Sequence, residues 1–206
     1  MTQDCGPSAR LDDRRAATGL APLLARTWLA LASVLLLQAA ALLAMGRPLI
    51  CPCGYVRLWY GEIGTPENSQ HLVDWWTYMH ILYGVALFVV LGLILPSMSV
   101  GQRLLIVAAL ALGWEVLENT PFIIERYRQG ALAMSYSGDS IVNSLVDTLA
   151  TLAGYLLAAA IPVRVVIVGA VLAELLSVYL IRDNLLLNAV QLVYPTETVS
   201  RWQVGQ

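Results

Sequence analysis

The chain has 206 residues, of which 58% are hydrophobic and 13% are charged, and its formal net charge is −2. A soluble globular protein carries about twice that charged fraction, at about 25%. The composition therefore excludes an ordinary soluble enzyme, and the lack of a basic excess argues against nucleic acid as a partner. Mean hydropathy is +0.69, and the apolar residues lie in long runs, which is typical of a multi-pass membrane protein.

A polar stretch at 1–23 comes first, and it shows no helical period, so we predict a mobile N-terminal tail. The first apolar run, 24–45, is longer than the 7–15 residues of a signal-peptide core, which favours a retained membrane helix. Four further membrane helices are predicted at 75–95, 103–121, 139–161 and 163–181.

The connections differ in character. A loop is predicted at 46–73, because Pro, Gly and Asn recur in this stretch. A second loop is predicted at 122–138, an amphipathic stretch in which polar residues interrupt the apolar ones. The segment 185–195 is apolar but only about half a span long, so an interfacial or re-entrant segment is expected. The predicted fold is one all-α domain over 24–206: a membrane bundle of about five helices plus a short C-terminal interfacial helix.

Three cysteines are present. Cys5 lies in the tail, whereas Cys51 and Cys53 flank Pro52 just after the first apolar run. Two independent thiols are the favoured interpretation, because two sulfurs one residue apart make a poor four-ligand metal site. A disulfide stays open if this loop faces an oxidising compartment.

Small residues recur every four positions in the fourth predicted span, at Ala150, Gly154 and Ala158. This spacing is typical of a face where two membrane helices approach closely.

Polar residues gather at one side of the predicted bundle. The second and fourth spans start, and the third and fifth spans end, on the same side, whatever the orientation. Each of these four ends carries a polar cluster: His71, Asp74 and His80; Glu115, Glu118 and Asn119; Asp139, Asn143 and Asp147; Arg182, Asp183 and Asn184. Ionisable groups inside membranes are costly and are retained mainly where they face protein, water or a ligand. We therefore predict a polar site in one leaflet.

The spacing within each helix supports a shared pocket. Asp139, Asn143 and Asp147 stand at i, i+4 and i+8 and form one stripe, and the polar residues at the end of the third span also share a face. Structural alternatives stay open: Asp74 and Asp139 could be helix N-caps, and His80 could be a hydrogen-bonded core histidine.

Acid–base chemistry is one use of such a site, since neighbouring carboxylates shift each other's pKa. The catalytic candidates are Glu115, Glu118, Asp139, Asp147 and His80. The ligand-binding candidates are His71, Asp74, Asn119, Arg126, Arg128, Asn143, Arg182, Asp183 and Asn184; the arginines among them could hold a phosphate or carboxylate head group by paired hydrogen bonds. Histidine with several carboxylates could also bind a divalent metal such as Zn or Mn, although no HExxH motif is present.

Orientation depends on the first helix. Arginines divide evenly between the two predicted sides, six on each. Because the first helix usually dominates, we predict a cytoplasmic N-terminus, which puts the polar site in the outer leaflet.

Several segments resemble an uncharacterised family of bacterial multi-pass inner-membrane proteins, a domain of unknown function. They are RPLICPCGYVRLW, ENSQHLVDWWTYMH, WEVLENTPFIIERYR, GDSIVNSLVD and IRDNLLLNAVQLVYP, and together they cover most of 47–195. The resemblance implies membrane location and topology but no reaction. More remotely, His80, Glu115 and the Asp139-x3-Asn143 pattern are similar to VanZ-like membrane proteins, which are linked to glycopeptide resistance; Asp147 stands where such a protein is expected to have glycine.

Three functions are compatible with these patterns. The first is a protein of the cell envelope that binds or processes the head group of a membrane lipid or envelope precursor. The second is a structural or assembly protein whose polar residues lock helices together. The third is a proton-coupled transporter, which would need polar residues through both leaflets. Whether the protein is an enzyme and which oligomeric state it adopts are left open by the sequence.

Overall fold

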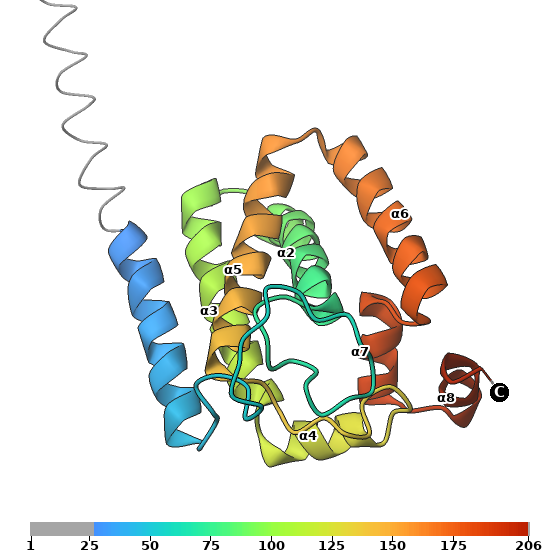
Figure 1. Cartoon of the computed structure of the whole chain (residues 1–206). Coiled ribbons are helices and arrows are strands. Elements are labelled where there is room, and N and C mark those ends of the chain that lie inside the picture. Colours follow the sequence, from blue (N-terminus) through green and yellow to red (C-terminus); the bar gives the residue numbers. More distant parts are fainter. Residues whose placement is uncertain (1–26, 206) are drawn as a thin grey trace, which may run out of the picture.

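In the computed structural model, residues 27–205 are described, and they form helices joined by loops (Figure 1). The predicted N-terminal tail, Cys5 and residues 24–26 of the first predicted span lie outside the described residues. The helices are Thr27–Ala44, α2 (Trp75–Ile94), α3 (Val100–Glu118), α4 (Pro121–Arg128), α5 (Ile141–Ala160), α6 (Val163–Ile181), α7 (Leu185–Val193) and α8 (Glu197–Gln203). Five of them are long and apolar enough to cross a membrane, which confirms the predicted all-α class.

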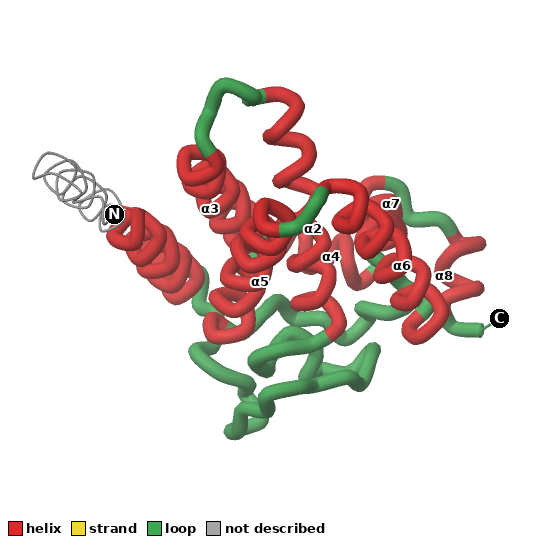
Figure 2. Tube along the Cα trace, turned by 90° about the horizontal axis from the view of Figure 1, so that it is seen from above, coloured by secondary structure: helices red, strands yellow, loops and turns green. Residues whose placement is uncertain are grey.

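Helix α5 is the centre of the bundle. Its apolar window is 56% buried, whereas those of Thr27–Ala44 and α6 are 17% buried. Figures 1 and 2 show α5 beside α2 and α3. A Cβ atom built on Gly84 of α2 would lie 2.0 Å from the Thr151 carbonyl oxygen, and one on Gly154 would lie 2.0 Å from the Ile81 carbonyl oxygen. The small residues therefore let the α2 and α5 backbones approach as predicted.

The two ends of the bundle differ. Short turns join α2 to α3 and α5 to α6 at one end, whereas α4, α7, α8 and the long loop after Thr27–Ala44 gather at the other (Figure 1). The starts of α2 and α5 and the ends of α3 and α6 thus lie together at one side, as the crossing count predicts.

The long loop holds the start of α5. The backbone N–H groups of Ser140, Ile141 and Val142 donate to the carbonyl oxygens of Ser69, Pro48 and Leu49 at 2.8–3.1 Å. These are the N–H groups that a helix leaves without an internal partner at its first turn. The loop therefore fixes the position of the polar stripe that α5 carries.

The structure corrects three details of the prediction. The stretch 122–138 is not only loop: α4 begins at Pro121, where the missing N–H costs nothing, and the Thr120 hydroxyl caps it. The N-cap of α5 is Ser140 rather than Asp139. The predicted short C-terminal helix is present as α7, but a further helix that the prediction lacked, α8, follows it.

Cys51 and Cys53 form a disulfide. The interpretation as two independent thiols is therefore wrong. Disulfides persist in oxidising compartments, and this bond lies in the long loop at the polar end of the bundle.

Candidate functional site

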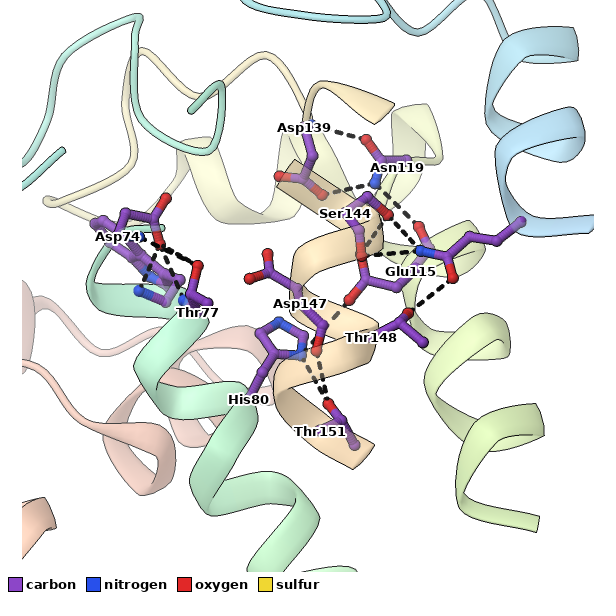
Figure 3. Close-up of polar contacts among 12 residues, drawn as sticks. Asp74, Thr77, His80, Glu115, Asn119, Asp139, Ser144, Asp147, Thr148 and Thr151 are labelled. Carbon is purple, nitrogen blue, oxygen red and sulfur yellow. Dashed lines mark hydrogen bonds and ion pairs between the residues drawn. The ribbon is translucent and has the colours of Figure 1, made fainter. Parts of the chain in front are cut away.

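The centre of the candidate site is an acid–histidine contact between three helices. His80 of α2 lies with its Nδ1 atom 3.5 Å from Oε1 of Glu115, on α3, and 3.3 Å from the hydroxyl of Thr151, on α5. The side chains of His80 and Glu115 are 11% and 1% exposed, so water barely reaches the contact. Figure 3 shows Asp147 beside His80, with its carboxylate directed toward the turn that holds Asp74 and Thr77.

A hydroxyl network orients Glu115. The Ser144 hydroxyl donates to Oε2 of Glu115 at 2.6 Å. The amide of Gln38, on the helix Thr27–Ala44, donates to the Ser144 hydroxyl at 2.8 Å and accepts from the Thr148 hydroxyl at 2.7 Å. Sequence reasoning missed Ser144, Thr148 and Thr151 as site residues. These three residues could have been found from their spacing of i, i+4 and i+7, which places them on one face of the helix, next to the stripe of Asn143 and Asp147.

Asp139 belongs to a separate network at the start of α5. Its Oδ2 accepts from the Asn119 amide at 2.7 Å, its Oδ1 accepts from the Tyr136 hydroxyl at 2.8 Å, and its N–H donates to Oδ1 of Asn119 at 2.8 Å. Burial raises the pKa of Asp139 from its ordinary 3.8 to about 6. These bonds tie the end of α3 to the start of α5.

This pKa predicts a pH dependence of stability. Because the folded chain binds the Asp139 proton more tightly than the unfolded chain, the free energy of unfolding should fall as pH rises from about 4 to about 6 and then level off. Burial gives Asp183 the same shift, to about 6. Thermal unfolding in detergent between pH 4 and 8 should show a shallower fall for Asp139→Asn. The matched control is Glu125→Gln, whose parent carboxylate is 69% exposed. Equal slopes for the parent and Asp139→Asn would contradict this assignment.

Two other candidates at this end hold the backbone. Asp74 caps α2: its carboxylate accepts from the N–H groups of Trp76, Thr77 and Ser69 at 2.8–3.1 Å. The N-cap alternative is therefore confirmed for Asp74. His71 is 1% exposed, its Nε2 lies 3.0 Å from Glu67, and its carbonyl oxygen accepts from the Asn143 amide.

The arginine candidates contact backbone carbonyls. Arg126 donates to the Leu192 and Val193 carbonyl oxygens at the end of α7, both at 2.6 Å. Arg128 donates to the Tyr136 carbonyl oxygen at 2.7 Å, and Arg182 donates to the Trp202 carbonyl oxygen at 3.0 Å. These bonds hold α4, α7 and α8 in place, and head-group binding by these arginines stays a prediction.

The remaining candidates organise α7. Asn184 caps this helix by accepting from the Leu187 N–H at 2.7 Å. Asp183 accepts from the side-chain amides of Asn188 and Gln203 at 3.5 and 3.3 Å. Glu174 of α6 also contacts this helix, because its carboxylate accepts from the N–H groups of Leu185 and Leu186.

A cavity of about 460 Å³ opens between α2, the end of α3, α4 and α7. Its lining consists of Trp76, Met79, His80, Tyr83, Trp114, Glu118, Tyr127, Leu185, Asn188, Ala189, Leu192 and Val193. The wall is thus mostly apolar and aromatic, with a few polar groups. Oε2 of Glu118 is buried and has no hydrogen-bond partner among the described residues. The predicted cluster therefore divides: His80 and Glu118 face the cavity, whereas Asp139 and Asn143 lie in the networks beside it.

Comparison with known proteins gives the family. A family model described as "Protein of unknown function (DUF2585)" matches residues 42–205. The chain belongs to the DUF2585 family. A UPF0314 protein of Sinorhizobium fredii is 43% identical over 87% of this chain and 92% of its own length, and one of Sphingopyxis alaskensis is 44% identical over 86% and 95%. A third, of Rhizobium etli, is 45% identical over 84% and 89%.

No solved structure matches the chain. The predicted resemblance to an uncharacterised bacterial family is confirmed, and the remote similarity to VanZ-like proteins stays a prediction. Membership of DUF2585 implies no particular reaction.

Proposed function

We propose that this DUF2585 protein binds the polar head group of a membrane lipid or envelope precursor in the cavity between α2, α3 and α7. The observation that carries the proposal is a cavity of about 460 Å³ in which a buried oxygen of Glu118 has no hydrogen-bond partner among the described residues. Ligand pockets are typically about 300–1,000 Å³, mostly apolar, with a few convergent polar groups.

The two kinds of lining match the two parts of an amphiphile. Met79, Leu185 and Leu192 offer apolar contacts to an acyl or isoprenoid chain, whereas His80 and Glu118 supply hydrogen-bonding groups for a head group. Since His80 and Glu118 are both titratable, the same pair could transfer a proton to or from a bound head group.

A structural role is the second candidate. It is favoured by the network of Gln38, Ser144, Thr148 and Glu115, which joins three helices through buried hydrogen bonds. Such bonds between membrane helices contribute to association. They leave the unpartnered Glu118 oxygen without an explanation, which is why the binding function is preferred.

The proposal includes an outward-facing site and a cytoplasmic N-terminus. The disulfide between Cys51 and Cys53 supports this orientation, because the long loop that carries it lies at the same end of the bundle as the site.

Accessibility labelling tests this orientation. In a Cys5→Ser background, Glu62→Cys should react with a membrane-impermeant maleimide in intact cells, because Glu62 lies exposed in the long loop. The matched variant Ser97→Cys lies exposed in the α2–α3 turn, at the opposite end, and should react only after permeabilisation. Reaction of Ser97→Cys in intact cells with Glu62→Cys protected would reverse the topology.

Filling the cavity tests the binding function. Ala189 lines the cavity on α7, whereas its neighbour Val190 does not. Native mass spectrometry of protein purified from its own membranes should show a retained lipid on the parent and on Val190→Phe, and at least tenfold less of it on Ala189→Phe. Equal lipid retention by the two phenylalanine variants, or none on the parent, would contradict the proposal.

A further inference from the structure

Among the residues that the structure describes, no arginine pairs with the acids beside His80. Glu115 and Asp147 are 0% and 4% exposed, and the ion pairs of the described residues join no arginine to Glu115, Glu118 or Asp147. Burying a charged group away from water is costly unless it is paired. Three carboxylates and one histidine therefore share an interior in which no arginine of residues 27–205 pairs with the acids.

Each of these acids also has one oxygen free of hydrogen bonds. Oε1 of Glu115, Oε2 of Glu118 and Oδ1 of Asp147 are buried and have no hydrogen-bond partner among the described residues. Buried polar atoms are nearly always hydrogen-bonded, so three unpartnered oxygens together call for an explanation. The Glu115 oxygen is the one that faces His80, at 3.5 Å from Nδ1.

The geometry fits a single ion. One potential ligand atom each from His80, Glu115 and Glu118 lie within 4.8 Å of one another. Tetrahedral binding of zinc at about 2.0–2.1 Å places neighbouring ligand atoms about 3.3 Å apart, so these side chains would draw closer together around a bound ion. The Ser144 hydroxyl, which donates to the other oxygen of Glu115, would orient that ligand.

We propose that His80, Glu115 and Glu118 bind one divalent cation, Zn²⁺ or Mn²⁺, at the wall of the cavity. One imidazole nitrogen and two carboxylates are a ligand set that these ions accept, and two carboxylates neutralise the charge of the ion. Since His80 and Glu118 line the cavity, a remaining coordination position faces it. The ion would there contact the phosphate or carboxylate of a head group, and this last step alone rests on the proposed function.

A second group of residues serves as an internal control. Cys51, Cys53, Glu67 and His71 also bring possible ligand atoms within 4.8 Å of one another. The two sulfurs are joined in the disulfide, and a disulfide offers no thiolate to a metal. Substitution of Glu67 should therefore leave metal binding unchanged.

The test is direct metal binding by the full chain in detergent. After treatment with EDTA and removal of the chelator, ZnCl₂ and MnCl₂ are titrated by calorimetry, and the retained metal is counted by mass spectrometry. The parent should bind about one ion. Glu115→Gln and Glu118→Gln should bind at least tenfold more weakly, and Glu67→Gln should bind as the parent does. If Glu115→Gln fails to fold, the metal affinity of Glu118→Gln is compared with that of the parent instead. Glu118 is partly exposed, so this variant is expected to fold.

Two results would overturn the metal site: no binding of either ion by the parent, or equal affinities for the parent and Glu118→Gln. Lipid retention after EDTA treatment separates this proposal from the binding function. Retained lipid without metal binding would sink the metal site alone, whereas metal binding on a protein that never retains lipid would sink the binding function alone.

Discussion

Gly154→Ala and Gly84→Ala are each expected to destabilise the protein by about 1–3 kcal/mol, the usual cost of overpacking a filled interior. In both cases the added methyl group would meet a backbone carbonyl oxygen 2.0 Å away, on the facing helix. A backbone atom has no rotamer by which to move aside, so α2 and α5 would have to separate. The change should appear as a lower midpoint of thermal unfolding in detergent, followed by circular dichroism.

Gly113→Ala and Gly169→Ala are the matched controls, because a Cβ at either position meets no atom within 4 Å. Both lie inside helices, where alanine is favoured over glycine by about 1 kcal/mol. They should therefore match or exceed the parent in stability. If the Gly154→Ala variant proved as stable as the Gly169→Ala variant, α2 and α5 would not cross closely at this point.

Glu115 and Glu118 lie three residues apart on α3, but their substitution should change stability in different ways. Both variants are measured in EDTA, so that no metal is bound. Glu115→Ala removes the acceptor of the Ser144 hydroxyl in a fully buried network, so stability should fall by about 1–3 kcal/mol. Glu118→Gln removes a charge from a side chain with an unpartnered buried oxygen, so stability should stay or rise. Asp147→Asn should behave like Glu118→Gln for the same reason.

Thermal unfolding and lipid retention are measured on the same preparations of these variants. A binding site predicts that Glu118→Gln keeps its stability and loses retained lipid. Loss of stability in Glu118→Gln and Asp147→Asn, with lipid retained on the folded fraction, would leave these acids only a structural role.

Much of the fold could be predicted because it depends on residue type alone. The length of the apolar runs located the membrane helices, and counting crossings placed the polar ends of α2, α3, α5 and α6 at one side. The Gly154 stripe predicted a close helix pair, although nothing in its spacing named α2 as the partner. Helix α4 was missed despite a readable signal, since Thr120 followed by Pro121 is a typical helix start.

The site could be predicted only in part, because spacing gives the face of a helix but not the contact opposite it. Asp139, Asn143 and Asp147 share a stripe, yet Asp139 bonds to Asn119 and Asn143 bonds to the His71 carbonyl. The contact between His80 and Glu115 joins two helices, and Gln38 reaches Ser144 across 106 residues of sequence. Likewise, only the folded loop shows that Cys51 pairs with Cys53.

The binding cavity itself is tested most directly by photolabelling in membranes. A phosphatidylethanolamine with a diazirine in its acyl chain is added to membranes at increasing concentration, and the labelled residues are mapped by mass spectrometry. We expect the labelling of cavity residues such as Met79 and Leu192 to saturate as the probe concentration rises. On the exposed face of α6, for example at Leu172, labelling should stay proportional to the probe concentration. Ala189→Phe should remove the saturable part only. A lipid-binding cavity would be contradicted if labelling were proportional to the probe concentration at every site and unchanged in Ala189→Phe.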